Sequence, residues 1–439
     1  MPNSSNSFLT KTESGGVAIG RDYLFLILGI MAFLSVFFTL TTVGGKDLRY
    51  VFPSIAFAVA IIYLWKREEK RGLLKHPIFY AIFAYVLVSY LMMPFSFDPQ
   101  VSGKYLYREV LTGFFIFISV AVSIGAYRKE GDIYLILTCL AVICLVLVLV
   151  GFIAIIISNP NPNMRYLKFP LFNFRLHYNN FPWYVNLIFP FMVAGVLIHH
   201  RLRTRMLFGG LVLFSALVLL LNISRGGWVS LFTTIVLWLV FLVKKDKKFL
   251  PPAAIGCLLV FILLTCLWFF SPVFKARAIS TGEDAKTITN RSMIWSAYIE
   301  TIKKSPVVGW GYGKKIKPSV VAKGPSDGTK KNKGEPWWNR KNAHNLILEI
   351  LFHQGLIGLL FFALFAGTTV FYMVKTIWFT GEAKEQLFFY AALCSFVSVF
   401  MVHGLIEIIS FPLLACLASL STGLLLNKPL FCLKPQAGS

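Results

Sequence analysis

Long apolar segments dominate the chain and alternate with short polar connections. Each segment is close to the roughly 20 residues that a helix needs to cross the hydrocarbon core of a membrane. The pattern predicts twelve spans, near residues 22–40, 49–65, 77–94, 105–126, 133–157, 183–198, 206–222, 227–243, 251–270, 345–374, 386–403 and 405–426. It also predicts three regions: spans one to nine in 1–270, a long polar loop in 271–344, and the last three spans with a C-terminal tail in 345–439.

Composition agrees with a membrane location. Hydrophobic residues make up 57% of the chain and charged residues 14%, and the mean hydropathy is +0.70. Backbone groups in lipid must be hydrogen-bonded internally, and uninterrupted apolar runs achieve this as helices. We therefore predict an all-α polytopic membrane protein. The first apolar run is predicted to be a retained helix rather than a signal peptide, because no small-residue cleavage pattern follows it.

Motifs for cofactors are missing from the sequence. All seven cysteines fall in or at the ends of apolar runs, which favours neither a disulfide framework nor a cysteine metal site. The outer connections hold no Asp-x-Asp pair for a metal-bound nucleotide sugar, and the chain has neither a P-loop nor a Gly-x-Ser-x-Gly elbow. The sequence therefore predicts no cofactor.

Basic residues sort the connections between spans into two sides, because Lys and Arg of short loops are retained in the cytoplasm. Four basic clusters occur on alternate connections, at residues 66–71, 128–129, 201–205 and 244–248. The short connections between them are poorer in basic residues. With an even number of spans, both termini are predicted to be cytoplasmic, and residues 271–342 are predicted to lie outside the cytoplasm.

The long outer loop contributes strongly to the net charge of +24, with fifteen Lys or Arg against five Asp or Glu between residues 271 and 342. Long loops are exempt from the positive-inside rule, so topology alone permits this excess. A ligand role is the favoured alternative, since a basic outer surface suits an anionic lipid, a diphosphate or a phosphorylated glycolipid. Residues 290–304 predict an amphipathic helix along the membrane surface, and residues 309–313 a flexible turn.

Two arginines are candidates for binding phosphate, because a guanidinium keeps its charge and matches phosphate oxygens with a planar set of donors. Arg225 lies between two apolar runs and precedes Gly226 and Gly227, which allow a ligand to approach the backbone at a helix N-terminus. Arg291 lies in the predicted amphipathic helix. The alternative for both is an arginine that only contacts lipid headgroups.

His344 lies where the polar loop meets the tenth apolar run. A histidine with a pKa near neutrality can accept a proton from a hydroxyl or hold a substrate group there, and the alternative is a structural cap. Glu349 follows five residues later, too far round the helix to share its face squarely. His353 is predicted to be structural.

Four short motifs occur in order between residues 222 and 360: Ser224-Arg225-Gly226-Gly227-Trp228, then Arg291 with Trp295, then Pro306 followed by Gly309-Trp310-Gly311-Tyr312-Gly313, and finally Ala343-His344-Asn345 with Glu349 and Gly355. Together they resemble the O-antigen ligase and O-antigen polymerase family, and the arrangement of spans fits that family. The resemblance implies a GT-C type glycosyltransferase of the bacterial inner membrane, with a periplasmic active site and no metal or nucleotide.

Members of that family take a glycan from undecaprenyl diphosphate. In ligases the acceptor is a sugar hydroxyl of lipid A–core, and in polymerases it is a second carrier-linked repeat; the basic outer loop favours the ligase. By resemblance, Arg225 and Arg291 would bind the diphosphate, and His344 would activate or orient the acceptor. Asn345 and Asn180 are further predicted substrate contacts, although Asn179-Asn180 lacks the proline of the family's Asn-Pro-Asn.

The expected partners are therefore the carrier-linked glycan, lipid A–core and membrane lipids, with no nucleic acid. A non-catalytic transporter of lipids or anions is the remaining alternative. It predicts ionisable residues at mid-membrane, and the interiors of the predicted spans hold few charges.

Overall fold

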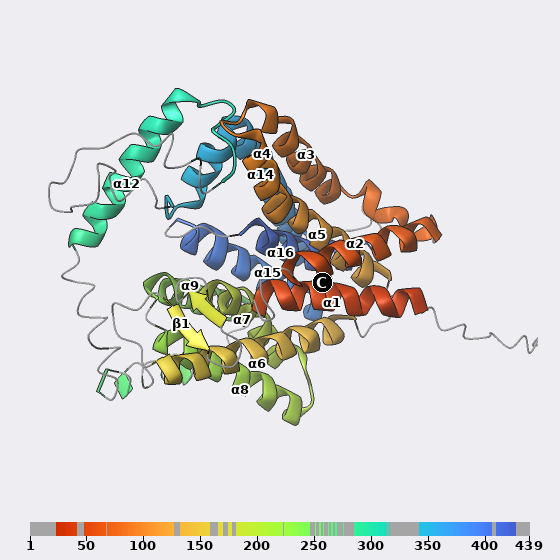
Figure 1. The fold of residues 1–439 in the computed structure, drawn as a ribbon. Helices are drawn as coiled ribbons and strands as arrows, with labels where there is room; N and C mark the ends of the chain where they lie inside the picture. The colour runs from red at the N-terminus through yellow and green to blue at the C-terminus, as the bar shows by residue number, and fades with distance from the viewer. Residues whose placement is uncertain are drawn as a thin grey trace, which may run out of the picture.

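Helices make up nearly all of the described structure (Figure 1). The computed structural model describes residues 23–41, 48–66, 68–126, 132–158, 166–169, 174–177, 181–222, 224–245, 285–313, 342–405 and 410–426, with isolated positions at 251, 254–255, 258, 262, 265–266, 268–269, 275 and 316. Asn180, one of the predicted substrate contacts, lies outside the described residues.

The elements follow one another along the chain as a series of helices with one strand pair. They are α1 (Tyr23–Thr41), α2 (Leu48–Lys66), the 3-10 helix η1 (Glu68–Lys75), α3 (Pro77–Leu91), the 3-10 helix η2 (Met93–Phe95), α4 (Pro99–Leu106), the π-helix η3 (Tyr107–Leu111), α5 (Thr112–Ala126), α6 (Asp132–Ser158), β1 (Tyr166–Phe169), β2 (Phe174–His177), α7 (Phe181–Ile198), α8 (Leu202–Leu221), α9 (Arg225–Lys245), α12 (Ala285–Lys304), α14 (Leu346–Phe379), α15 (Ala383–Ser395), the π-helix η7 (Phe396–His403) and α16 (Phe411–Leu425).

The prediction of an all-α polytopic membrane protein is confirmed. Among the described residues, nine helices are long and apolar enough to cross a membrane, and two shorter apolar helices occur at residues 26–39 and 411–425. They correspond to eleven of the predicted spans. The remaining predicted span, 251–270, lies mostly outside the described residues. The last span is shorter than predicted, because α16 begins at Phe411 rather than near residue 405.

Close packing of α5 against α16 holds the centre of the bundle. An added methyl group at Gly113 of α5 would lie 2.5 Å from the ring of Phe411, and one at Gly423 of α16 would lie 2.6 Å from Ile124. Small residues at such contacts let two backbones approach, which is how helices associate in a solvent as apolar as their side chains. One continuous cluster of buried apolar residues runs from α1 through α16.

One antiparallel strand pair interrupts the helices. β1 pairs with β2 in a register that places Tyr166 opposite His177. The pattern of apolar residues did not predict these strands, because four residues in each strand are too few to show an alternation of two. β1 contacts α6, and the pair leaves the helical class unchanged.

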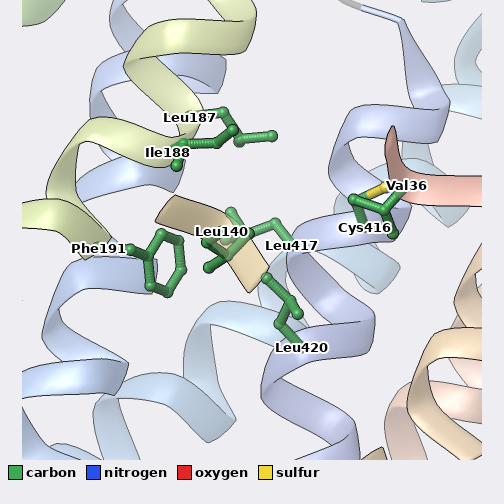
Figure 2. A pocket seen from close by; sticks show the side chains of 8 residues that line it. All are labelled: Val36, Leu140, Leu187, Ile188, Phe191, Cys416, Leu417 and Leu420. Carbon is green, nitrogen blue, oxygen red and sulfur yellow. The ribbon is translucent and has the colours of Figure 1, made fainter. Parts of the chain in front are cut away.

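Two cavities lie among the apolar helices, and neither is lined by Arg225, Arg291 or His344. The smaller, of about 20 Å³, is enclosed by side chains of α1, α6, α7 and α16, with Phe191 directed toward Leu140 and Leu417 (Figure 2). The larger, of about 410 Å³, lies between α1, α5, α6 and α16. Both are almost entirely apolar, so neither provides groups for chemistry.

Candidate functional site

Arg225 is the first residue of α9, and the turn that carries it is held from two sides. The hydroxyl of buried Ser224 accepts from the amide of Gly227 at 3.4 Å, which caps the helix. The side-chain amide of Asn186, in α7, donates to the Gly227 carbonyl at 3.1 Å. Arg225 itself is half-buried. The Arg225 side chain therefore starts at the N-terminus of α9, where the amide dipoles also favour an anion.

The same turn rests on His403, at the end of η7. A methyl group on Gly226 would lie 2.7 Å from Nε2 of His403, so only a glycine permits this approach. His403 is completely buried, and its Nε2 accepts from Nε1 of Trp183 at 3.1 Å. Sequence reasoning missed His403, because nothing in the apolar pattern of its segment relates it to the turn at Arg225.

His344 has a backbone φ of +50°, which a residue with a side chain rarely adopts. Hydrogen bonds hold the backbone on both sides of His344. The carbonyl of buried Ala343 accepts from Nε1 of Trp295 at 2.8 Å, and the amide of Leu346 donates to the carbonyl of Gly404 at 2.8 Å. The His344 side chain remains half-buried. The left-handed turn is thus maintained by contacts from α12 and from the residue after η7.

Asn345 is the N-cap of α14. Its Oδ1 accepts from the amide of Leu348 at 3.1 Å, and its Nδ2 lies 3.4 Å from the carbonyl of Leu405. These bonds give a structural reason for an asparagine at this position. A substrate contact of Asn345 stays a prediction.

Arg291 lies on α12, which begins at Ala285, five residues before the predicted start. Trp295 follows Arg291 by four residues and so lies on the same face of the helix. The apolar face of α12 was predicted to lie along the membrane surface. In the structure, Tyr298 on that face is buried, with its ring 5.1 Å from that of Phe352 in α14. Part of the helix therefore packs on protein, and Figure 1 shows α12 outside the main bundle.

These contacts connect three of the sequence-predicted site residues. Arg225 adjoins Gly226, which packs on His403; Gly404, the next residue, bonds the start of α14 two residues after His344. On the other side, Ala343 bonds Trp295, one turn after Arg291 on α12. Segments that are far apart in the sequence therefore meet around the His344 turn.

A buried carboxylate lies directly behind this turn. Glu349 is 3% exposed, and its Oε1 accepts from the Ala343 amide at 2.8 Å. Its Oε2 is 3.1 Å from Nε2 of His353, and the other ring nitrogen of His353 is 2.7 Å from the Gly311 carbonyl. The sequence analysis judged Glu349 to lie too far round the helix from His344 to share its face, and it predicted a structural role for His353. Their four-residue separation on a predicted helix was the signal that pairs them.

Two tyrosines next to this pair are held in the neutral form. Burial, followed by the charge of Glu349 and a hydrogen bond with it, raises the pKa of Tyr298 well above its usual value. Burial and the neighbouring hydroxyl of Tyr85 raise the pKa of Tyr312 well above its usual value. The Tyr312 ring stacks on His353 with centroids 4.5 Å apart.

The segment 309–313 was predicted to be a flexible turn. The structure corrects this, because backbone amides of the segment are hydrogen-bonded to α14. α14 is broken at Gly355, which has φ +62° and ψ −161°. The amides of Trp310 and Gly311 bond the carbonyls of Phe352 and His353 at 2.8 and 2.9 Å, just before the break.

Just after the break, amides of α14 donate to carbonyls of the segment that begins at Pro306. Leu356 donates to the carbonyl of Pro306 at 2.8 Å, and Ile357 donates to that of Val307 at 3.2 Å. The segment from Pro306 to Gly311 therefore replaces the helical hydrogen bonds that α14 lacks at Gly355. We refer to residues 306–311 as the clasp.

Within the described part of the chain, no group of three or more His, Cys, Asp or Glu side chains is arranged to hold a metal ion. The described cysteines are Cys139, Cys144, Cys266, Cys394 and Cys416, and all are free thiols.

Comparison with known proteins identifies the segment that carries these motifs. Residues 210–363 match the family model described as O-antigen ligase. The match begins in α8, includes the Arg225 turn, α12 and the His344 turn, and ends in α14 after the break. A search of curated proteins found no match. Residues 210–363 of the chain are therefore similar to the O-antigen ligase family, in agreement with the resemblance carried by the motifs.

Proposed function

We propose that this protein is an O-antigen ligase, which transfers a glycan from undecaprenyl diphosphate to a sugar hydroxyl of lipid A–core. The reaction is placed on the periplasmic side of the bacterial inner membrane, with both chain termini in the cytoplasm. Transfer inverts the configuration at the anomeric carbon and requires no metal. The match of residues 210–363 to the O-antigen ligase model supports a glycan-transferring function broadly, and the choice of acceptor is the proposal.

One observation carries the proposal. The matched segment includes two half-buried arginines and a half-buried histidine, and the segments that carry them are joined by contacts across α9, α12, α14 and η7. Cations and a residue able to accept a proton, carried on segments that meet, suit transfer from a diphosphate. The basic character of residues 271–342 additionally suits a phosphorylated acceptor.

In the proposed reaction, a bond forms between the acceptor oxygen and the anomeric carbon of the glycan while the bond from that carbon to the diphosphate breaks. The leaving diphosphate keeps the electron pair of the broken bond. Arg225 and Arg291 stabilise the negative charge that grows on its oxygen, and do so more in the transition state than in the bound donor. His344 receives the proton of the acceptor hydroxyl, or orients that hydroxyl if its proton leaves late.

The test is in vitro transfer with purified protein, a defined carrier-linked glycan, lipid A–core and EDTA. Transfer to lipid A–core in EDTA is expected. Joining of two carrier-linked glycans with no transfer to lipid A–core would make the protein a polymerase. Movement of lipid across vesicles without any transfer would identify a transporter, and loss of transfer in EDTA would overturn metal independence.

Site variants test the residue roles. Arg225→Ala and His344→Ala are expected to abolish the O-antigen ladder on lipopolysaccharide in cells that contain normal amounts of each variant. The matched controls are Arg203→Ala and His200→Ala, because both residues are exposed on described parts of the chain distant from the contacts of the site. Undiminished ladders in the two site variants would refute the assigned roles.

A further inference from the structure

We propose that Glu349 is a positioning residue, which holds the His344 turn in its left-handed conformation through the Ala343 amide. This inference rests on the proposed role of His344 in acceptor activation. The geometry that carries it is direct: one carboxylate oxygen of Glu349 accepts from the peptide amide immediately before His344, at 2.8 Å. The other oxygen is 3.1 Å from His353 Nε2.

The turn needs such support because of its backbone. His344 has φ +50°, and a side-chain-bearing residue keeps that conformation only where surrounding contacts impose it. Three contacts surround the turn: Glu349 on the Ala343 amide, Trp295 on the Ala343 carbonyl, and Gly404 on the Leu346 amide. Glu349 is the member of the three that accepts from the amide directly before His344, and a buried amide left without its acceptor is costly.

The position of Glu349 is itself determined by His353. Nδ1 of His353 faces the Gly311 carbonyl at 2.7 Å, and a carbonyl can only accept, so Nδ1 carries a proton. A proton must then lie between Nε2 and the facing carboxylate oxygen of Glu349, on one or the other, for these atoms to bond at 3.1 Å. In either arrangement the carboxyl group is held between the His344 turn and the clasp.

Stacking and hydrogen bonds extend this support away from the turn. The His353 ring lies parallel to that of Tyr312, and the Tyr312 hydroxyl is 3.3 Å from that of Tyr85 in α3. The Ala343 amide is therefore linked, through Glu349 and His353, to a membrane-spanning helix of the bundle. The support resembles the outer partners that orient a catalytic histidine in other enzymes, although here it acts on the backbone.

The substitution Glu349→Gln separates geometry from charge. The glutamine carbonyl oxygen can accept from the Ala343 amide, and its NH₂ group can donate to Nε2 of a neutral His353. Every bond of the carboxylate toward these two partners then has a replacement. Glu349→Leu fills similar space and replaces neither bond. Glu300→Leu is the control, because Glu300 is exposed on α12.

The experiment compares these variants for transfer per folded molecule, donor binding and amide hydrogen exchange. For Glu349→Leu we expect turnover lower by about tenfold to hundredfold, the effect of leaving the buried Ala343 amide without its acceptor. Faster exchange of the peptide containing residues 343–346 and unchanged donor affinity should accompany it. Glu349→Gln should restore both turnover and exchange to near the values of the unchanged protein, and Glu300→Leu should alter neither.

Three results would overturn the proposal. Unchanged turnover or unchanged local exchange in Glu349→Leu would show that the turn does not depend on the bond. An equal loss in Glu349→Gln and Glu349→Leu would mean that charge, not position, matters. Loss of donor binding would place the effect elsewhere. Full activity of His344→Ala would instead refute the proposed function, so the two failures are distinguishable.

Discussion

Replacing Gly355 with alanine tests the interpretation of the break in α14. The residue has φ +62° and ψ −161°, a region occupied almost only by glycine. A methyl group there would lie 2.3 Å from the carbonyl oxygen of Val307 and 2.7 Å from the amide nitrogen of Gly309. Both are backbone atoms of the clasp region, and they cannot rotate away as a side chain can. The variant must therefore separate the clasp from α14.

The magnitude follows from two costs. Forcing a non-glycine residue into this backbone region costs about 1–3 kcal/mol. Overpacking against atoms that cannot yield adds about 1–3 kcal/mol. The free energy of unfolding should therefore fall by about 2–6 kcal/mol in Gly355→Ala. Glycan transfer should fall as well, because the clasp also contacts His353 through the Gly311 carbonyl.

The assay is thermal unfolding of purified protein in detergent, with glycan transfer measured in parallel. Gly367→Ala is the matched control, since Gly367 lies in the same helix and a methyl group there would meet no atom within 4 Å. That control should be neutral or more stable by about 0.5–1 kcal/mol, from the better helix propensity of alanine. If Gly355→Ala unfolds at the same temperature as Gly367→Ala, the steric argument is wrong.

Three further predictions concern the surroundings of the site. Gly226→Ala should displace His403 and lower stability by about 1–3 kcal/mol, measured by thermal unfolding against Gly210→Ala, where a methyl group has open space; equal melting temperatures would contradict it. Trp295→Phe keeps an aromatic ring but loses the N–H that donates to the Ala343 carbonyl at 2.8 Å, so the free energy of unfolding should fall by about 1 kcal/mol; no change on unfolding by denaturant would argue against that bond. The Tyr312 pKa is raised in the folded state, so an unfolded tyrosine loses its proton first as pH rises past 10.0 and stability should decline there; Tyr312→Phe should show a weaker decline, and an identical pH profile would refute the cause.

The apolar pattern of the sequence determined the membrane class and the positions of most helices. Runs of about 20 apolar residues have one stable solution in lipid, because each helix satisfies its own backbone. Local chemistry also marked the start of α14, where Asn345 is suited to capping. The order of the motifs around Arg225, Arg291 and His344 was likewise visible in the sequence, as was the family that they resemble.

Only the tertiary structure decided which of these residues meet and what holds them. His403 faces Gly226 from a segment almost 180 residues away in the chain, about nine times the length of an ordinary span. The clasp completes a helix broken at Gly355, and Glu349 turns back to the amide before His344. Each depends on a partner that is distant in sequence or on a backbone conformation outside regular helix. Hydrophobic periodicity describes one helix face at a time, so it contains no information about such partners.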